Sequence, residues 1–199
     1  HPMQARWDGS GIWELYIPDI GNGTQYKYCL KTYNGKVLHK SDPFARYSQI
    51  PPNTASVVCD TAYQWQDQDW LKSRNERKGK TRPQSVYEIH LGSWKKIAAE
   101  ANRSLSYQEM ASELVAYVKE MGFTDVEMMP VMEHPYYASW GYQITGYFAA
   151  SSRYGSPEEL MHLIDCFHQS GIGVIMDWVP SHFPTDAHGI GYFDGTHLY

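Results

Sequence analysis

The sequence predicts an α/β chain in which antiparallel strands come first and parallel β-α units follow. Up to residue 60, short stretches alternate apolar and polar residues with a period of two. From residue 85, strand-like stretches alternate with amphipathic helices. We therefore expect a partial antiparallel β-sandwich over residues 1–60, a linker over 61–84 and parallel β-α units over 85–199.

The expected sandwich rests on about four strand-like stretches, and it is therefore partial. Residues 11–17 and 24–31 alternate regularly, and 55–59 is a further apolar stretch. Asn34 and Gly35 are the strongest two-residue signal for a hairpin, and residues 36–39 return from it.

Two helices with clear end signals separate three strands in the second part. Ser106 and Glu109 have the spacing of a capping box, and Gly122 ends the first helix. Ser156 and Pro157 begin the second, which closes at Gly171. The strands that we expect lie at residues 86–91, 125–129 and 172–179. This order fits either a doubly wound sheet or a (β/α)₈ TIM barrel.

Composition excludes several classes of function. The net charge of −5, with one short basic stretch between Lys72 and Arg82 that we interpret as linker, argues against nucleic acid as a partner. No run of eighteen apolar residues is present, so we expect no membrane contact. Three well-separated cysteines form no disulfide or zinc pattern, which favours the cytoplasm. The aromatic share of 15% suits either core packing or the apolar faces of sugars.

Polar residues follow the expected second and third strands, where parallel β-α folds place their sites. Asp177 and His182 follow the third strand and are candidate site residues. The alternative is that Asp177 caps a turn and that His182 is a loop histidine with its hydrogen bonds satisfied. The long loop 133–143 is dense in aromatic residues, and it is either functional or a packing lid. The later Asp and His residues match no recognised metal-ligand spacing, so we expect no metal site.

Three motifs carry a resemblance to a known family. YEIHLGSW at 87–94, MPVMEHPYYASWGYQITGYFA at 129–149 and DWVPSHF at 177–183 resemble the α-amylase superfamily, and within it the bacterial 1,4-α-glucan branching enzymes. SGIWELYIP and DPFARYSQIPPNTASVV resemble the carbohydrate-binding sandwich that precedes the barrel in those enzymes. The resemblance implies a partial (β/α)₈ TIM barrel comprising its first three strands.

The resemblance also implies roles for three residues. Tyr142 matches the aromatic platform beneath the sugar, Asp177 supports the polar network of the active site, and His182 hydrogen-bonds the same sugar. Gln143 is similar to the residue of branching enzymes rather than debranching relatives. Ser181 stands where calcium-binding amylases usually carry Asn, so we expect no structural calcium and no cofactor. The implied partner is an α-glucan such as amylose or glycogen.

The motifs that carry the family's two catalytic carboxyl groups do not occur in the expected barrel part of this sequence. The one Arg-x-Asp sequence, Arg6 to Asp8, lies far upstream in the expected sandwich, and no His-Asp dipeptide occurs. Retaining glycoside chemistry needs both a nucleophile and an acid/base. We therefore expect the chain to be part of a longer branching enzyme and to be inactive alone. The alternatives are a non-catalytic glucan-binding module and an α-1,6 debranching relative.

We predict that the isolated chain of 199 residues is unstable or aggregates. Three parallel strands without their barrel partners leave an open sheet edge and an uncovered apolar face. Denaturant unfolding combined with sedimentation checks this prediction, and a sharp, cooperative transition of a monomer would contradict it.

Overall fold

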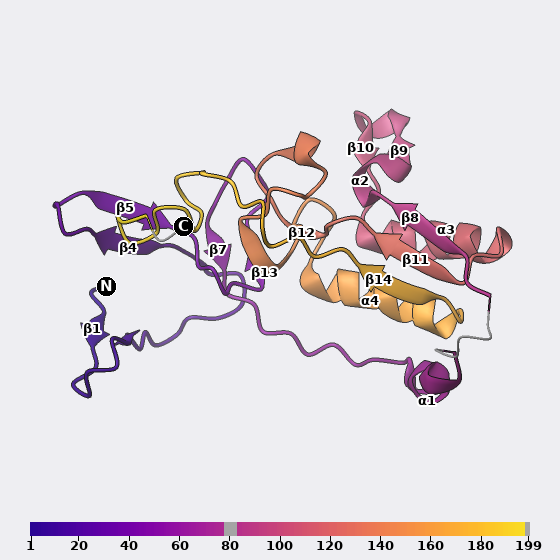
Figure 1. Cartoon of the computed structure of the whole chain (residues 1–199), viewed down its shortest axis with the longest axis horizontal. Coiled ribbons are helices and arrows are strands. Elements are labelled where there is room, and N and C mark those ends of the chain that lie inside the picture. The colour runs from indigo at the N-terminus through magenta and orange to yellow at the C-terminus, as the bar shows by residue number, and fades with distance from the viewer. Residues whose placement is uncertain (78–82, 198–199) are drawn as a thin grey trace.

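The computed structural model describes residues 1–77 and 83–197. Lys78, Lys80 and Arg82 of the expected basic linker lie outside the described residues, as does Tyr199. Small antiparallel β-sheets at one end of the molecule are followed by a helix-covered parallel sheet at the other (Figure 1).

The N-terminal region consists of antiparallel pairs of short strands. Strand β3 pairs with β7, which also pairs with β6, while β1 pairs with β2 and β4 with β5. The bounds are β1 (Gln4–Ala5), β2 (Trp13–Glu14), β3 (Gln25–Tyr26), β4 (Tyr28–Lys31), β5 (Val37–Lys40), β6 (Tyr47–Ser48) and β7 (Ser56–Val57). Within the stretch predicted as a strand over 11–17, only β2 is a strand, and both β2 residues and Leu15 are exposed.

The segment 61–84, which we expected to be a linker, contains a docked helix. Helix α1 (Gln68–Arg77) lies within it. The ring of Trp70 stacks on His168 with ring centroids 4.9 Å apart, and His168 Nδ1 lies 2.8 Å from Asp67 Oδ2. The polar composition of the segment gave no indication of these two anchoring side chains. The domain boundaries remain a prediction.

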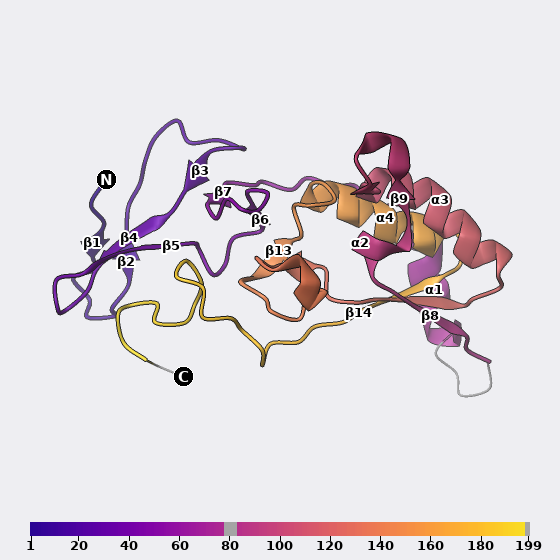
Figure 2. The same cartoon turned by 90° about the horizontal axis from the view of Figure 1, so that it is seen from above.

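The second part is built on three parallel strands in sequential order. Strand β11 (Asp125–Met128) lies between β8 (Val86–Ile89) and β14 (Gly173–Met176). Helices α3 (Tyr107–Glu120) and α4 (Pro157–Gln169) pack against each other along one face of this sheet (Figures 1 and 2). The buried core includes side chains from both helices and from the central strand, among them Leu114, Val118, Leu163, Phe167, Val126 and Met128.

The other face of the parallel sheet is partly uncovered. Val86 and Ile175 are exposed apolar side chains on this face of its two outer strands. Such a face is expected of a barrel wall whose interior is not filled by facing strands. None of the helices among the described residues is both long and apolar enough to cross a membrane.

Both long helices begin with a complete capping box, as predicted for the first of them. Ser106 Oγ accepts a hydrogen bond from the Glu109 N–H, while the Glu109 carboxylate accepts one from the Ser106 N–H. Ser156 and Glu159 repeat the arrangement in α4, with Pro157 at its first position. Each box satisfies amide groups that have no partner within the helix.

Short elements connect these units. The strand expected over 86–91 ends at Ile89, because the chain turns there into a short helix, α2. The remaining elements are α2 (Leu91–Trp94), β9 (Lys96–Ile97), η1 (Ala98–Glu100), β10 (Arg103–Ser104), β12 (Met132–Glu133), η2 (Tyr137–Ser139) and β13 (Gly146–Ala150). Strands β12 and β13 form an antiparallel hairpin whose connection carries the aromatic loop.

We predict that Ser106→Ala lowers the free energy of unfolding by about 1 kcal/mol, because a capping oxygen is lost. The matched control is Ser112→Ala on the exposed side of the same helix, which removes a hydroxyl that is not part of the cap. Chemical denaturation of the protein that carries the chain measures both changes. Equal effects of the two substitutions would contradict the role of the capping box.

Candidate functional site

The carboxyl ends of the three parallel strands meet at one level of the sheet. Ile89, Met128 and Met176 occupy the same position in the three strands. The ladder continues beyond them, since the Asp177 N–H donates to Met128 O over 3.0 Å and the Met129 N–H donates to Ile89 O over 2.9 Å. The backbone of Asp177 is therefore held at this edge by the sheet itself.

Tyr142 reaches the same edge because Gly141 lets the long loop approach the end of β11. Gly141 has a positive φ of +87°, and a Cβ built on it would lie 2.3 Å from Pro130 O. Only a residue without a side chain tolerates both conditions. The Tyr142 N–H donates to Ser139 O and closes the turn.

Two of the predicted site residues are joined directly. The Tyr142 hydroxyl donates to Asp177 Oδ2 over 2.8 Å, although the residues are 35 positions apart. Desolvation, followed by this hydrogen bond, raises the pKa of Tyr142 to about 12. The phenol is therefore a protonated donor at neutral pH, and the bond fixes the orientation of its ring.

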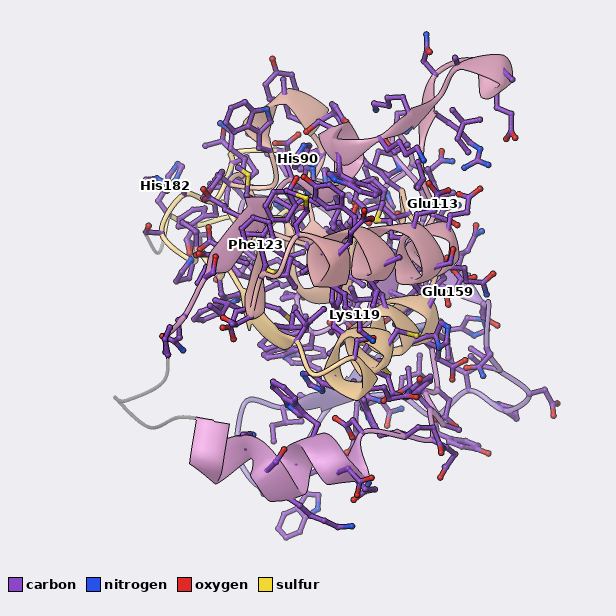
Figure 3. The ribbon with its side chains drawn as sticks, turned by 90° about the vertical axis from the view of Figure 1, so that its right-hand side faces the viewer. His90, Glu113, Lys119, Phe123, Glu159 and His182 are labelled. Carbon is purple, nitrogen blue, oxygen red and sulfur yellow. The ribbon has the colours of Figure 1, made fainter. Side chains whose placement is uncertain are left out.

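His182, the third predicted residue, is not joined to this pair. Its side chain is exposed and forms no hydrogen bond or ion pair with the described residues. Figure 3 shows it at the margin of the molecule. The loop 178–186 that carries it contains no helix or strand, so its position depends on little local structure.

His90 is a further residue at this edge that sequence reasoning did not single out as a site residue. It follows β8 directly, and its ring lies 5.8 Å from that of Tyr137 and 6.3 Å from that of Trp140. Its Nδ1 lies 2.9 Å from Ser93 Oγ. Burial, then Lys96, lowers its pKa, which favours a neutral ring. Its position at a strand end was the available signal.

The arrangement suits a sugar better than a metal ion. Trp140 lies two positions before Tyr142, and Trp178 follows Asp177 directly. Both expose their indole rings, and rings of this kind can cover the apolar C–H face of a pyranose. Within residues 1–77 and 83–197, no group of three His, Cys, Asp or Glu side chains could hold a metal ion. Hydrogen-bonding groups and exposed rings are the chemistry that this edge offers.

Comparison with known proteins agrees with this arrangement. Residues 108–195 match the catalytic domain of alpha amylase, and residues 1–45 match carbohydrate-binding module 48, the isoamylase N-terminal domain. Over these residues the chain is similar to the alpha-amylase superfamily. The resemblance inferred from the motifs is thereby confirmed, as is the coarse architecture of a carbohydrate-binding sandwich followed by part of an amylase barrel.

Individual relatives of the chain indicate a narrower group of enzymes than the family models do. The chain is 59% identical to the 1,4-alpha-glucan branching enzyme of Aquifex aeolicus and 52% identical to that of Pseudomonas aeruginosa. Each comparison covers 100% of this chain but only 31% and 27% of the relative, so the chain spans about a third of their length. A crystal structure from Salmonella typhimurium, provisionally described as an alpha amylase, matches with a TM-score of 0.67 and 27% identity, covering 96% of this chain and 33% of that one.

We predict that Gly141→Ala costs about 1–3 kcal/mol of stability, since it forces a left-handed conformation on alanine and a clash with Pro130 O. The substitution also displaces Tyr142 from Asp177, and the pKa of Tyr142 then falls from about 12 towards its ordinary value of 10. Ultraviolet absorbance of the tyrosine phenolates between pH 9 and 13 measures this change. The difference between the protein and its Tyr142→Phe variant gives the part of the titration that belongs to Tyr142.

The control is Gly35→Ala, which also has a positive φ but nothing within 4 Å of an added Cβ. It shares the backbone strain without the clash and lies in the N-terminal hairpin. An unchanged tyrosine titration in the Gly141 variant, or the same change in both variants, would contradict the positioning role of Gly141.

Proposed function

We propose that the chain forms part of the glucan cleft of a 1,4-α-glucan branching enzyme. The Tyr142–Asp177 hydrogen bond is the observation that carries this proposal, because it unites two segments of the family's motifs at one edge of the sheet. The identity of 47–59% with branching enzymes supports the choice within the superfamily.

The proposed reaction has two steps. The whole protein cuts an α-1,4 linkage, holds the released glycosyl segment covalently and transfers it to a 6-hydroxyl, which creates an α-1,6 branch. In this account the ring of Tyr142 supports the sugar at the bond that is cut, and Asp177 holds the Tyr142 hydroxyl while its other oxygen faces the substrate. The hydrogen bonds and the flat ring fit the distorted sugar better than the undistorted one, and they therefore stabilise the oxocarbenium-like transition state.

The finer assignments belong to the same proposal. We propose that β8, β11 and β14 are the first three strands of a (β/α)₈ barrel, supported by their parallel, sequential order. His182 is proposed to contact the same sugar once substrate orders its loop. A cytoplasmic location remains a prediction, supported by three free cysteines.

A second candidate is hydrolysis of α-1,6 linkages by a debranching relative. The match of residues 1–45 to a module also described as the isoamylase N-terminal domain favours it. Products separate the two reactions, because hydrolysis of branches creates reducing ends and removes branches, whereas branching adds α-1,6 linkages without new reducing ends. A non-catalytic glucan-binding module would bind glycogen and change neither quantity.

We predict that the protein that carries this chain introduces branches into amylose, seen as a shift of the iodine spectrum and as new α-1,6 linkages. Tyr142→Ala and Asp177→Asn each lower the rate by about 10- to 100-fold, because misplacing the sugar affects the transition state directly. Tyr33→Ala, which removes a fully exposed ring of the N-terminal hairpin, is the control and keeps the rate. New reducing ends without branches, or full activity of the Tyr142 variant, would contradict the proposal.

A further inference from the structure

Lys40, the last residue of β5, is a buried cation without an anionic partner. The residue is 1% exposed, and it forms no ion pair with any of the residues that the structure describes. Lysine is almost never fully buried unless it is paired. Its Nζ donates instead to Gly189 O over 3.1 Å and to Gly191 O over 3.0 Å. The two carbonyl groups thus offset part of the cost of burying the ammonium group.

Residues 188–195, which we call the docked segment, lie against the β4–β5 hairpin. The Ser41 N–H donates to His188 O over 2.9 Å at the start of the segment. At its other end, a Cβ built on Gly195 would lie 2.3 Å from Thr32 Cγ2, so the backbone of the segment touches the hairpin directly. Figure 1 shows the C-terminal part of the chain beside β4 and β5. A segment that follows β14 is therefore held by the N-terminal region.

The docked segment fixes the far end of the loop that carries His182. The near end of this loop, 178–186, is fixed at Asp177, whose N–H belongs to the ladder of the sheet. Between these ends the chain contains no helix or strand, and the Tyr147 hydroxyl adds a hydrogen bond to Pro180 O over 3.3 Å. A loop with two fixed ends samples fewer conformations than a loop with one free end. Less conformational entropy is then lost when the loop takes a single position.

We propose that Lys40 is a positioning residue of the glucan cleft, because by holding Gly189 and Gly191 it fixes the loop that places His182 against the sugar. The inference rests on the proposed function, in which His182 contacts the sugar at the strand ends. Lys40 is buried and acts through the loop rather than on the substrate. The N-terminal region thereby contributes to the cleft through a main-chain contact.

The substitution Lys40→Met separates the hydrogen bonds of Lys40 from its packing. Methionine keeps an unbranched chain of similar length but donates nothing, so Gly189 O and Gly191 O lose their donor. A buried carbonyl group without a donor is costly, and undocking lets water satisfy it. We therefore expect this variant to release the docked segment from the hairpin. Circular dichroism checks that the variant still folds.

A double-mutant cycle tests whether Lys40 acts through His182. In the protein that carries the chain, Lys40→Met is expected to lower kcat/KM for amylose about five- to tenfold, because the loop must be ordered when the substrate binds. His182→Ala is expected to lower it at least as much. The double variant is expected to be no slower than His182→Ala alone, since the contact that Lys40 positions is already absent. Lys36→Met, on the exposed part of the same hairpin, is the control and keeps kcat/KM.

A second variant releases the docked segment without changing Lys40. Gly195→Ala places a methyl group against Thr32 and forces alanine into a positive φ of +94°. We expect it to lower kcat/KM as Lys40→Met does, and to lose this effect in the His182→Ala background. Gly9→Ala, also at a positive φ but with nothing within 4 Å of the added Cβ, is the matched control and leaves kcat/KM unchanged.

Hydrogen exchange measures the docking independently of activity. The Ser41 N–H is protected by its hydrogen bond to His188 O. We expect this amide to exchange about tenfold faster, or more, in Lys40→Met and in Gly195→Ala than in the unmodified protein. The Lys36→Met protein is expected to show the original rate.

The proposal is overturned if the losses from Lys40→Met and His182→Ala multiply in the double variant, which would show a structural effect that does not pass through His182. It is also overturned if Lys36→Met lowers kcat/KM equally, or if the Ser41 amide exchanges at the same rate in the Lys40→Met protein. The branching assay on the unmodified protein decides the proposed function separately. Should that protein hydrolyse glucan instead, the same cycle measured on hydrolysis still decides the role of Lys40.

Discussion

The in-register pairing of three parallel strands is the constraint on which the candidate site depends. Strands β8, β11 and β14 place Ile89, Met128 and Met176 side by side, so whatever follows each strand emerges at one edge. Asp177 gains its position in this way from main-chain hydrogen bonds alone. Tyr142 is brought to the side chain of Asp177 by a loop that returns to the end of β11 at Gly141, where no side chain would fit. A slip of one residue in the β14 pairing would move the Asp177 side chain to the other face.

A buried polar network supports the hairpin that carries this loop. Glu133 is almost completely buried, yet its carboxylate lies 3.0 Å from Arg153 Nη1 and accepts hydrogen bonds from the N–H and hydroxyl of Ser152. Burial raises the pKa of Glu133, while these bonds act in the opposite direction. Its neighbour His134 lines a cavity together with residues of the N-terminal region. The same two residues thus connect the loop of the candidate cleft with the N-terminal region.

Local signals in the sequence predicted much of the α/β part. The caps at Ser106 and Ser156, the glycine at each helix end and the three strands all appear in the structure, because each depends on neighbouring residues. The placement of the loop 133–143 and of Asp177 at one edge followed from the rule that parallel strands share their carboxyl ends, whereas the hydrogen bond between Tyr142 and Asp177 was not predicted. The family roles of these residues came from resemblance rather than from spacing.

Features that depend on contacts distant in sequence could not be predicted. Helix α1 was missed because its anchors, Trp70 and Asp67, meet His168 about a hundred positions later. The cavity lined by Ser41, His134 and Asp186 was missed for the same reason, since its walls come from three separate segments. His90 was overlooked at its strand end, and the exposed position of His182 shows that a motif residue can lie in a segment with little local structure.

The most direct test of the central claim is a crystal structure of the protein that carries this chain in complex with maltoheptaose, read at the Tyr142–Asp177 edge. The account predicts a glucosyl ring lying against the ring of Tyr142, with a sugar hydroxyl within hydrogen-bonding distance of Asp177 and the Tyr142–Asp177 bond retained. Maltoheptaose bound elsewhere, with this edge empty or with Tyr142 turned away from Asp177, would contradict it.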